Sequence, residues 1–248
     1  MPKSYKITIV EELSVGAFEE KDLLLTKQSS LPGLNPGPQT KIRRAQSPVT
    51  FGDFTSLEIE HEYPMFVSGR TFEDGRPFNK IIAKGDIRGY HSQERGLLLL
   101  QGKKSDILDF CRQTGSLQFM PLRTIEIDMK GLQEKLPEIR GVWFRFKSGF
   151  IRAKGYMGQS IQDTADYCDA KAEGDISTLS FYFEDDRDGC RHPVMITEDG
   201  TVVLQRNYTS REEEIDFVLH VKQTLLDGLF QVLEDPAKAK THIAPEIS

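Results

Sequence analysis

Short segments that alternate apolar and polar residues dominate the C-terminal half of this chain. They lie at residues 142–147, 150–157, 179–183, 194–197 and 201–205. Two further segments have the helical period, one at 161–172 and one that opens at Ser210 and runs to Leu233. Alternation indicates half-buried strands, and the helical period indicates amphipathic helices. The succession β-β-α-β-β-β-α therefore predicts an α+β fold, in which two helices cover one face of an antiparallel sheet.

The N-terminal half is less regular but also contains strand signals. Residues 57–63 alternate strictly, which predicts a strand with Glu58, Glu60 and Glu62 on its polar face and a hydrogen-bonded His61 on its apolar face. We expect three regions along the chain: a mixed α+β part over 1–128, the sheet with its two helices over 129–234, and a flexible tail over 235–248.

Residues 26–52 contain four of the twelve prolines and no acidic side chain. This composition predicts a long flexible loop, and structureless loops of this length are commonly functional. Its cations include Lys41, Arg43 and Arg44. We expect these three side chains to assist in binding a ligand.

Composition limits the class of protein. The longest purely aliphatic run is 97–100, too short for a membrane-spanning helix. Cys111, Cys168 and Cys190 are widely spaced and form no CxxC pair, so we expect reduced thiols and a cytoplasmic protein with no membrane association. A net charge of −6 disfavours a uniformly basic nucleic-acid coat but is compatible with a local basic patch.

Such a patch is predicted at residues 139–158, which contain five basic residues and no acidic one. The rest of the chain then has 27 basic against 38 acidic residues, a net charge of −11. A two-residue turn at 148–149 predicts that residue 147 pairs with 150, 145 with 152 and 143 with 154. One face of this hairpin would then carry Trp143, Arg145, Lys147, Phe150, Arg152 and Lys154.

Interleaved cations and rings suit single-stranded nucleic acid, because phosphates meet Lys and Arg while bases stack on aromatic rings. We therefore predict a non-catalytic subunit that binds nucleic acid or another phosphate-rich ligand, assisted by Arg43 and Arg44. Two alternatives explain the same cations: the glutamates at 58–62 neutralise them within the protein, or an acidic protein partner covers them. In a different class, the apolar side of the last helix forms a protein–protein or homo-oligomeric interface.

Candidate catalytic groups are sparse. Asp86, followed by Gln101 and Lys103 after an aliphatic strand, resembles the core of PD-(D/E)xK nucleases with Gln in the acidic position. That resemblance implies Mg²⁺ held by Asp86 and Gln101 and water oriented by Lys103. The acidic run 184–189 lacks the final glutamate of a calcium loop and predicts a solvated turn. No nucleophile, P-loop, dinucleotide or zinc motif occurs, so we expect no cofactor or metal, and an enzyme is the less favoured interpretation.

Overall fold

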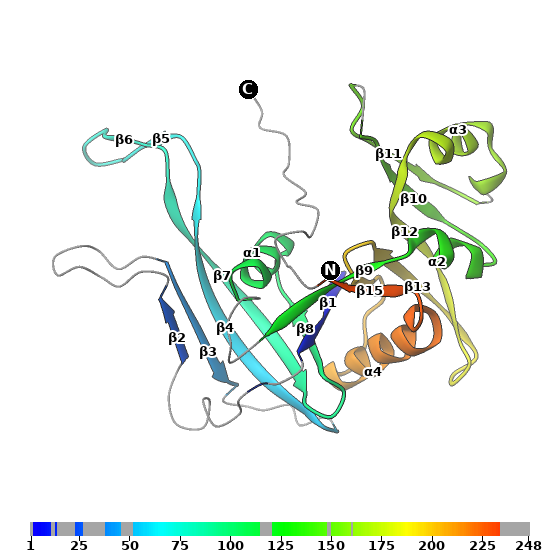
Figure 1. Ribbon diagram of the computed structural model, residues 1–248, viewed down its shortest axis with the longest axis horizontal. Coiled ribbons are helices and arrows are strands. Elements are labelled where there is room, and N and C mark those ends of the chain that lie inside the picture. Colours follow the sequence, from blue (N-terminus) through cyan, green and yellow to red (C-terminus); the bar gives the residue numbers. More distant parts are fainter. Residues whose placement is uncertain are drawn as a thin grey trace. The chain divides into compact units, whose positions relative to one another are not determined.

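The computed structural model describes residues 2–10, 13, 38–45, 52–114, 121–147, 150–159 and 161–233, together with the backbone of 23–26 (Figure 1). The chain forms two compact units. Unit 1 contains Met1–Ile9 and Arg123–Ser248, and unit 2 contains Val10–Leu122. The division lies at Leu122, slightly before the end of the N-terminal region expected at 1–128, and the first strand belongs with the C-terminal part of the chain.

Unit 2 is built on an antiparallel sheet with strand order β8-β7-β4-β3-β2. Its elements are β2 (Leu23–Thr26), β3 (Gln39–Arg44), β4 (Phe54–Met65), β5 (Gly69–Arg70), β6 (Pro77–Phe78), β7 (Ile81–Ser92), β8 (Leu97–Gln101) and α1 (Lys104–Thr114).

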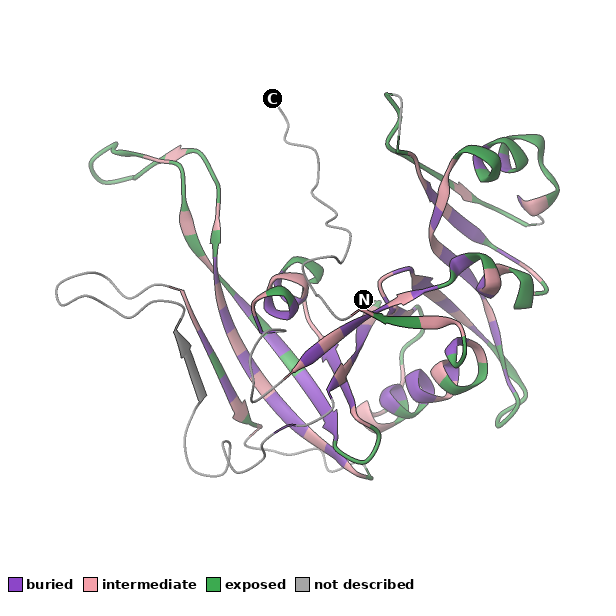
Figure 2. Ribbon diagram, viewed as in Figure 1, coloured by how far each residue is buried: buried purple, intermediate pink, exposed green. Residues whose placement is uncertain are grey.

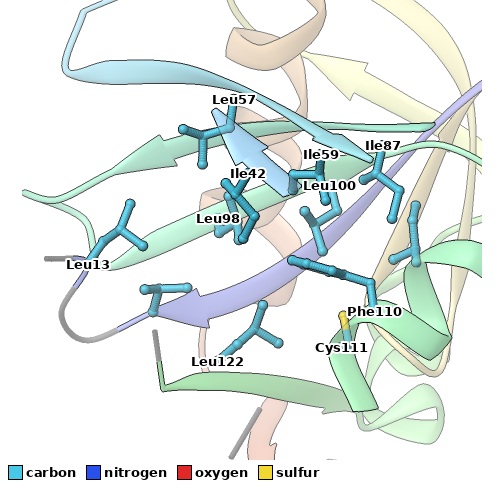
Figure 3. Packing of buried hydrophobic residues seen from close by; sticks show 12 residues of the cluster. Leu13, Ile42, Leu57, Ile59, Ile87, Leu98, Leu100, Phe110, Cys111 and Leu122 are labelled. Carbon is cyan, nitrogen blue, oxygen red and sulfur yellow. The ribbon is translucent and has the colours of Figure 1, made fainter. Parts of the chain in front are cut away.

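The alternation at 57–63 produces the core of unit 2. Leu57 and Ile59 of β4 point to the same side as Leu98 of β8, and this side packs against Phe110 of α1 (Figure 3). All four side chains are almost fully buried. The opposite phase of β4 carries the three glutamates at 58, 60 and 62, which are half-exposed. The predicted strand and the assignment of its two faces are therefore confirmed.

Unit 1 is also an antiparallel sheet with helices. Its strands run in the order β11-β10-β12-β13-β14-β1, and β9 joins β1 and β15. The elements are β1 (Lys3–Val10), β9 (Leu122–Ile127), α2 (Met129–Lys135), β10 (Gly141–Arg145), β11 (Ala153–Met157), α3 (Ala165–Glu173), β12 (Asp175–Asp185), β13 (Cys190–Thr197), β14 (Thr201–Leu204), α4 (Arg211–Val221) and β15 (Phe230–Leu233).

One face of this sheet is apolar and carries the helices. Phe144 of β10 contacts Tyr167 of α3, and Phe183 of β12 contacts Phe217 of α4. Figure 2 shows the buried residues concentrated along these strands and on the inner side of α4. The predicted α+β class, with an antiparallel sheet in the C-terminal half and helices on one face, is confirmed.

Three details of the secondary structure differ from the prediction. The cationic segment near Arg43 forms strand β3, so residues 26–52 are not a loop throughout, although 27–37 and 46–51 lie outside the described residues. Helix α3 begins after the N-cap Thr164, and its buried residues are Tyr167 and Ala170. The helical period over 161–172 predicts that Ile161, Ala165, Cys168 and Ala172 share the buried face. The last three of these are exposed, because the helix begins after Thr164 and buries Tyr167 and Ala170 instead.

The last helix is shorter than predicted. α4 ends at Val221 and is followed by a π-helical turn and by Gly228, whose φ is +83°. Glycine adopts this left-handed conformation without steric cost, so the chain reverses there and Phe230–Leu233 pairs with β9 as a strand. The tail expected at 235–248 lies outside the described residues.

Candidate functional site

The predicted register of the β10–β11 hairpin is wrong by one residue. Arg145 pairs with Ala153 and Phe144 with Lys154, and the amide of Phe146 donates to the carbonyl of Arg152 at 2.9 Å. Five residues, 147–151, separate this last described pair, so a two-residue turn does not set the register; residues 148 and 149 themselves lie outside the described residues. A shift by one residue exchanges the faces of one strand. Lys154 therefore lies on the apolar side, with its ammonium 5.7 Å from the centre of the Phe146 ring.

The first two cations of the hairpin have carboxylate partners within unit 1. Arg145 donates two hydrogen bonds to Glu198, one of them at 2.8 Å, and Lys147 forms an ion pair with Asp175 at 2.9 Å. Lys147, Asp175 and Glu198 line a polar hollow of about 350 Å³. The basic hairpin is thus partly neutralised, but by Glu198 and Asp175 and not by the glutamates that the sequence suggested.

The side chains that follow the turn of the hairpin are exposed to solvent. Phe150 is 107% exposed and Ile151 is 52% exposed, and Arg152 and Lys154 are exposed as well. Lys147 also remains largely exposed despite its ion pair. We call Lys147, Phe150, Ile151, Arg152 and Lys154 the hairpin tip. It combines three accessible cations with an aromatic ring, and no acidic residue occurs between 139 and 158.

Trp143 lies on the face of the sheet opposite the helices. It pairs with Gly155, and a Cβ atom placed on Gly155 would lie 2.7 Å from the indole Nε1. The same indole lies close to Gly141. The two glycines therefore leave room for the ring to lie against the backbone. On the same face, the guanidinium groups of Arg140 and Arg191 lie 4.5 and 4.8 Å from the centre of the Tyr182 ring.

The glutamates at 58–62, which the sequence offered as one alternative for neutralising the hairpin, have other partners in unit 2. Arg43 of β3 forms ion pairs with Glu58 at 2.9 Å and with Glu60 at 3.4 Å, and Lys84 reaches Glu60 at 2.9 Å. Arg43 is therefore held within its own sheet, whereas Arg44 is exposed. Both residues, predicted to assist the hairpin, belong to the other unit.

The nuclease-like residues are only partly brought together. Asp86 and Gln101 line one polar hollow of about 470 Å³ on unit 2, together with Glu58 and Glu60. Lys103 is exposed beyond the strand, where its carbonyl accepts hydrogen bonds from the amides of Asp106 and Ile107 in the first turn of α1. Among the described residues, carboxylate and histidine groups that converge closely enough to hold a metal ion occur around Asp185 and not at this hollow. The geometry does not favour the nuclease interpretation.

The groups around Asp185 were not predicted as a site. Asp185 gathers with Asp188 and His192, and separately with Asp186 and His220. The side chain of Arg187 donates to both oxygens of Asp185 at 2.9 and 2.8 Å, so a cation of the chain itself already pairs with this carboxylate. These hydrogen bonds lower the pKa of Asp185 to about 2. The segment is a turn stabilised by its own arginine.

Two features that the sequence singled out, His61 and the apolar side of the last helix, are part of the protein core. His61 is fully buried, and its ring nitrogens contact the Thr40 hydroxyl at 2.8 Å and Asp109 at 3.0 Å. It is the hydrogen-bonded core histidine that the sequence predicted. The apolar side of α4 is likewise used within unit 1, since Ile215 and Val218 are fully buried. This helix therefore offers no broad apolar face to another protein.

Comparison with known proteins gives no family and no relative: no sequence profile of a known family matches the chain, and no curated protein is significantly similar to it. Within the described part of the chain, no helix is long and apolar enough to cross a lipid bilayer.

Proposed function

We propose that this protein is a non-catalytic binding subunit that contacts single-stranded nucleic acid through the hairpin tip. The observation that carries the proposal is the bare ring of Phe150 between exposed cations. Phosphates are attracted to Lys147, Arg152 and Lys154, and an exposed ring can stack on any base regardless of sequence. The shifted register moves the proposed contact from the face of the sheet to the end of the hairpin.

Trp143 provides the means to test the proposal. It is the single tryptophan of the chain and lies four residues before Lys147 on the same hairpin. An unlabelled oligonucleotide is titrated at low salt while the intrinsic emission is followed. The expected result is a saturable change in emission. A flat signal at tens of micromolar oligonucleotide, together with no binding by sedimentation, would overturn the proposal.

The salt dependence of binding tests the phosphate contacts directly. Three phosphate contacts on a single strand give a slope of about −2 in log K against log salt concentration. The variant Lys147→Ala/Arg152→Ala/Lys154→Ala should bind more weakly and lose most of this slope. Its matched control, Lys103→Ala/Arg112→Ala/Lys171→Ala, removes three exposed cations elsewhere and should bind like the wild-type protein. Equal losses in both variants would show that net charge alone is responsible.

We also propose that the protein acts in the cytoplasm. Cys168 and Cys190 are free and exposed, and Cys111 is free and buried. Exposed free thiols are typical of a reducing compartment.

A further inference from the structure

Strand β11 forms one edge of the unit 1 sheet (Figure 1). It pairs with β10 on one side, and within the described part of the chain no strand pairs with its other side. Four of its five residues are exposed, so this free side is open to solvent. An exposed edge strand offers unpaired backbone donors and acceptors to another chain.

The hydrogen bonds to β10 determine which backbone groups of β11 are unpaired. The amide of Phe146 donates to the carbonyl of Arg152 at 2.9 Å, and the amide of Gly158 donates to the carbonyl of Arg140 at 3.0 Å. Both pairs continue the register of the hairpin, and an antiparallel ladder repeats every two residues. The even-numbered residues of β11 therefore bond to β10. The amides and carbonyls that point away from β10 belong to Ala153, Gly155 and Met157.

The alternation of donors and acceptors along this edge favours a peptide as its occupant. An added strand supplies both amides and carbonyls at the spacing of β11, so it can pair with all of these groups. The backbone of a nucleic acid supplies phosphate oxygens, which accept hydrogen bonds and would leave the outward carbonyls unpaired.

The charge beside this edge favours an acidic peptide. Arg152 and Lys154 have the same phase along the chain, both are exposed, and neither has a carboxylate partner among the described residues. Strand pairing places residues of the added strand directly beside them, where carboxylates would neutralise both cations. A second copy of β11 would instead add two more cations to the same face, so it is not the expected partner.

The opposite face of β11 adds an apolar component to this pattern. Gly155 has no side chain, and the indole of Trp143 lies against it. Met157, two residues further along, is 74% exposed on the same face. Residues of an added strand on this face would contact the indole and the thioether, so apolar side chains fit there. The segment that matches both faces is extended and alternates acidic with apolar residues.

We propose that β11 is a docking edge for an acidic extended peptide, which adds a strand to the unit 1 sheet and places its carboxylates beside Arg152 and Lys154. This inference goes beyond the proposed function and does not depend on it. The two ligands share these two cations, but only the peptide needs the outward backbone groups of β11, and only the nucleic acid needs the ring of Phe150.

Fluorescence anisotropy on the full-length chain tests the proposal with two labelled peptides of about eight residues, enough to pair along the whole of β11. One peptide alternates glutamate with valine, and the other alternates lysine with valine. The acidic peptide should bind saturably and lose affinity as the salt concentration rises, because salt screens surface charges. The basic peptide should not bind. No saturable binding of the acidic peptide up to about 1 mM, or equal binding of the two peptides, would overturn the proposal.

A proline substitution tests the backbone contact separately from the side chains. Ala153→Pro removes an amide that points away from β10, so the hairpin keeps its own hydrogen bonds. It should weaken binding of the acidic peptide at least about fivefold, because one backbone hydrogen bond is lost. The matched control Ala153→Val keeps the amide and should bind like the wild-type protein. Far-UV circular dichroism verifies that both variants fold, and a folded proline variant that binds as tightly as the control contradicts strand addition.

A charge reversal tests the choice of partner. Arg152→Glu/Lys154→Glu should exchange the preference, so that the basic peptide binds and the acidic one does not. The control Lys103→Glu/Lys171→Glu makes the same change of net charge on exposed side chains elsewhere and should keep the wild-type preference. An unchanged preference in the β11 variant would show that its cations do not select the peptide, and the proposal would be wrong.

Titration of the same variants with an oligonucleotide separates this proposal from the binding of nucleic acid. Ala153→Pro should bind an oligonucleotide like the wild-type protein, because Phe150 and the cations remain. Phe150→Ser should weaken only the oligonucleotide. Peptide binding without oligonucleotide binding supports strand addition and overturns the proposed function. The reverse result overturns strand addition and leaves nucleic-acid binding in place.

Discussion

The ion pair between Arg145 and Glu198 makes it possible to test whether a cationic side chain of the hairpin stabilises the fold or binds a ligand. Their side chains are 21% and 10% exposed, and two hydrogen bonds join them. A more exposed pair in the same unit, Arg191 of β13 with Glu138, is 49% and 36% exposed and has one hydrogen bond, at 3.0 Å. The change to test is Arg145→Met, which keeps the volume of the side chain and removes its charge and donors.

The two pairs should differ clearly in the free energy of unfolding. Removing one partner from a mostly buried pair costs about 3–5 kcal/mol, and exposed pairs contribute about 0–1 kcal/mol. Because Arg145 retains some exposure, we expect Arg145→Met to destabilise unit 1 by about 2–3 kcal/mol. Arg191→Met should cost less than about 1 kcal/mol. A double-mutant cycle with Glu198→Gln should return most of the Arg145 effect as coupling energy.

Urea unfolding followed by Trp143 emission measures this quantity for unit 1, which contains the single tryptophan. The same samples are then titrated with an oligonucleotide. We expect Arg145→Met to bind within about twofold of wild type in conditions where it is folded, because its guanidinium is already held by Glu198. Two results would refute this reasoning: Arg145→Met is no less stable than Arg191→Met, or it loses oligonucleotide binding together with the salt slope. Either result would show that Arg145 is a ligand contact and that its pair with Glu198 is incidental.

Three further predictions concern stability. Gly200→Ala should lower the free energy of unfolding in urea by more than about 2 kcal/mol, because the added Cβ would lie 2.7 Å from Ile125 Cδ1 at a φ of +78°. Gly228→Ala, which has a φ of +83° but open space around it, should lower it by only about 1 kcal/mol. Equal losses in the two variants would contradict the steric argument. Burial lowers the pKa of His91, so below about pH 6.5 the unfolded state binds more protons than the folded state. The free energy of unfolding should therefore fall between about pH 7.5 and pH 5.5. The fall should be less steep in His91→Gln. Hydrogen bonds from the neighbouring arginine lower the pKa of Asp185 to about 2, so its contribution to stability is complete above about pH 4 and is lost towards pH 2; acid titration of Asp185→Asn should lack this component.

Local patterns identified most of the elements of unit 1 but not how they are joined. The two-residue alternation located β10, β11 and β12, because one side of each strand faces the helices. The register of the hairpin depends instead on a loop whose length the alternation does not determine. The same limit applies at Gly228, where a helical pattern of apolar residues continues into a strand because the glycine reverses the chain.

The site was harder to predict because its electrostatics are not local in sequence. Glu198 lies 53 positions from Arg145, so an acid-free stretch of sequence gives no information about whether its cations are neutralised. Two of the glutamates that share a face of β4, Glu58 and Glu60, pair instead with Arg43, which is also distant from them in sequence but adjacent in the sheet. Composition located the basic hairpin correctly, and only the tertiary structure shows which of its cations are available to a ligand.

The order of residues along β4 also indicates where this strand extends beyond the rest of its sheet. The polar phase of β4 reads Glu58, Glu60, Glu62 and then continues without a shift into Pro64 and Phe66. Because the phase is unchanged, the two apolar residues must stay on the face that α1 does not cover, and the structure leaves both exposed. Proline removes a backbone donor and is tolerated at unpaired edges, so it fits the point where β3 no longer accompanies the strand. A change from charged to apolar residues within one phase therefore indicates a surface that the fold itself does not bury, and here it falls on Pro64 and Phe66.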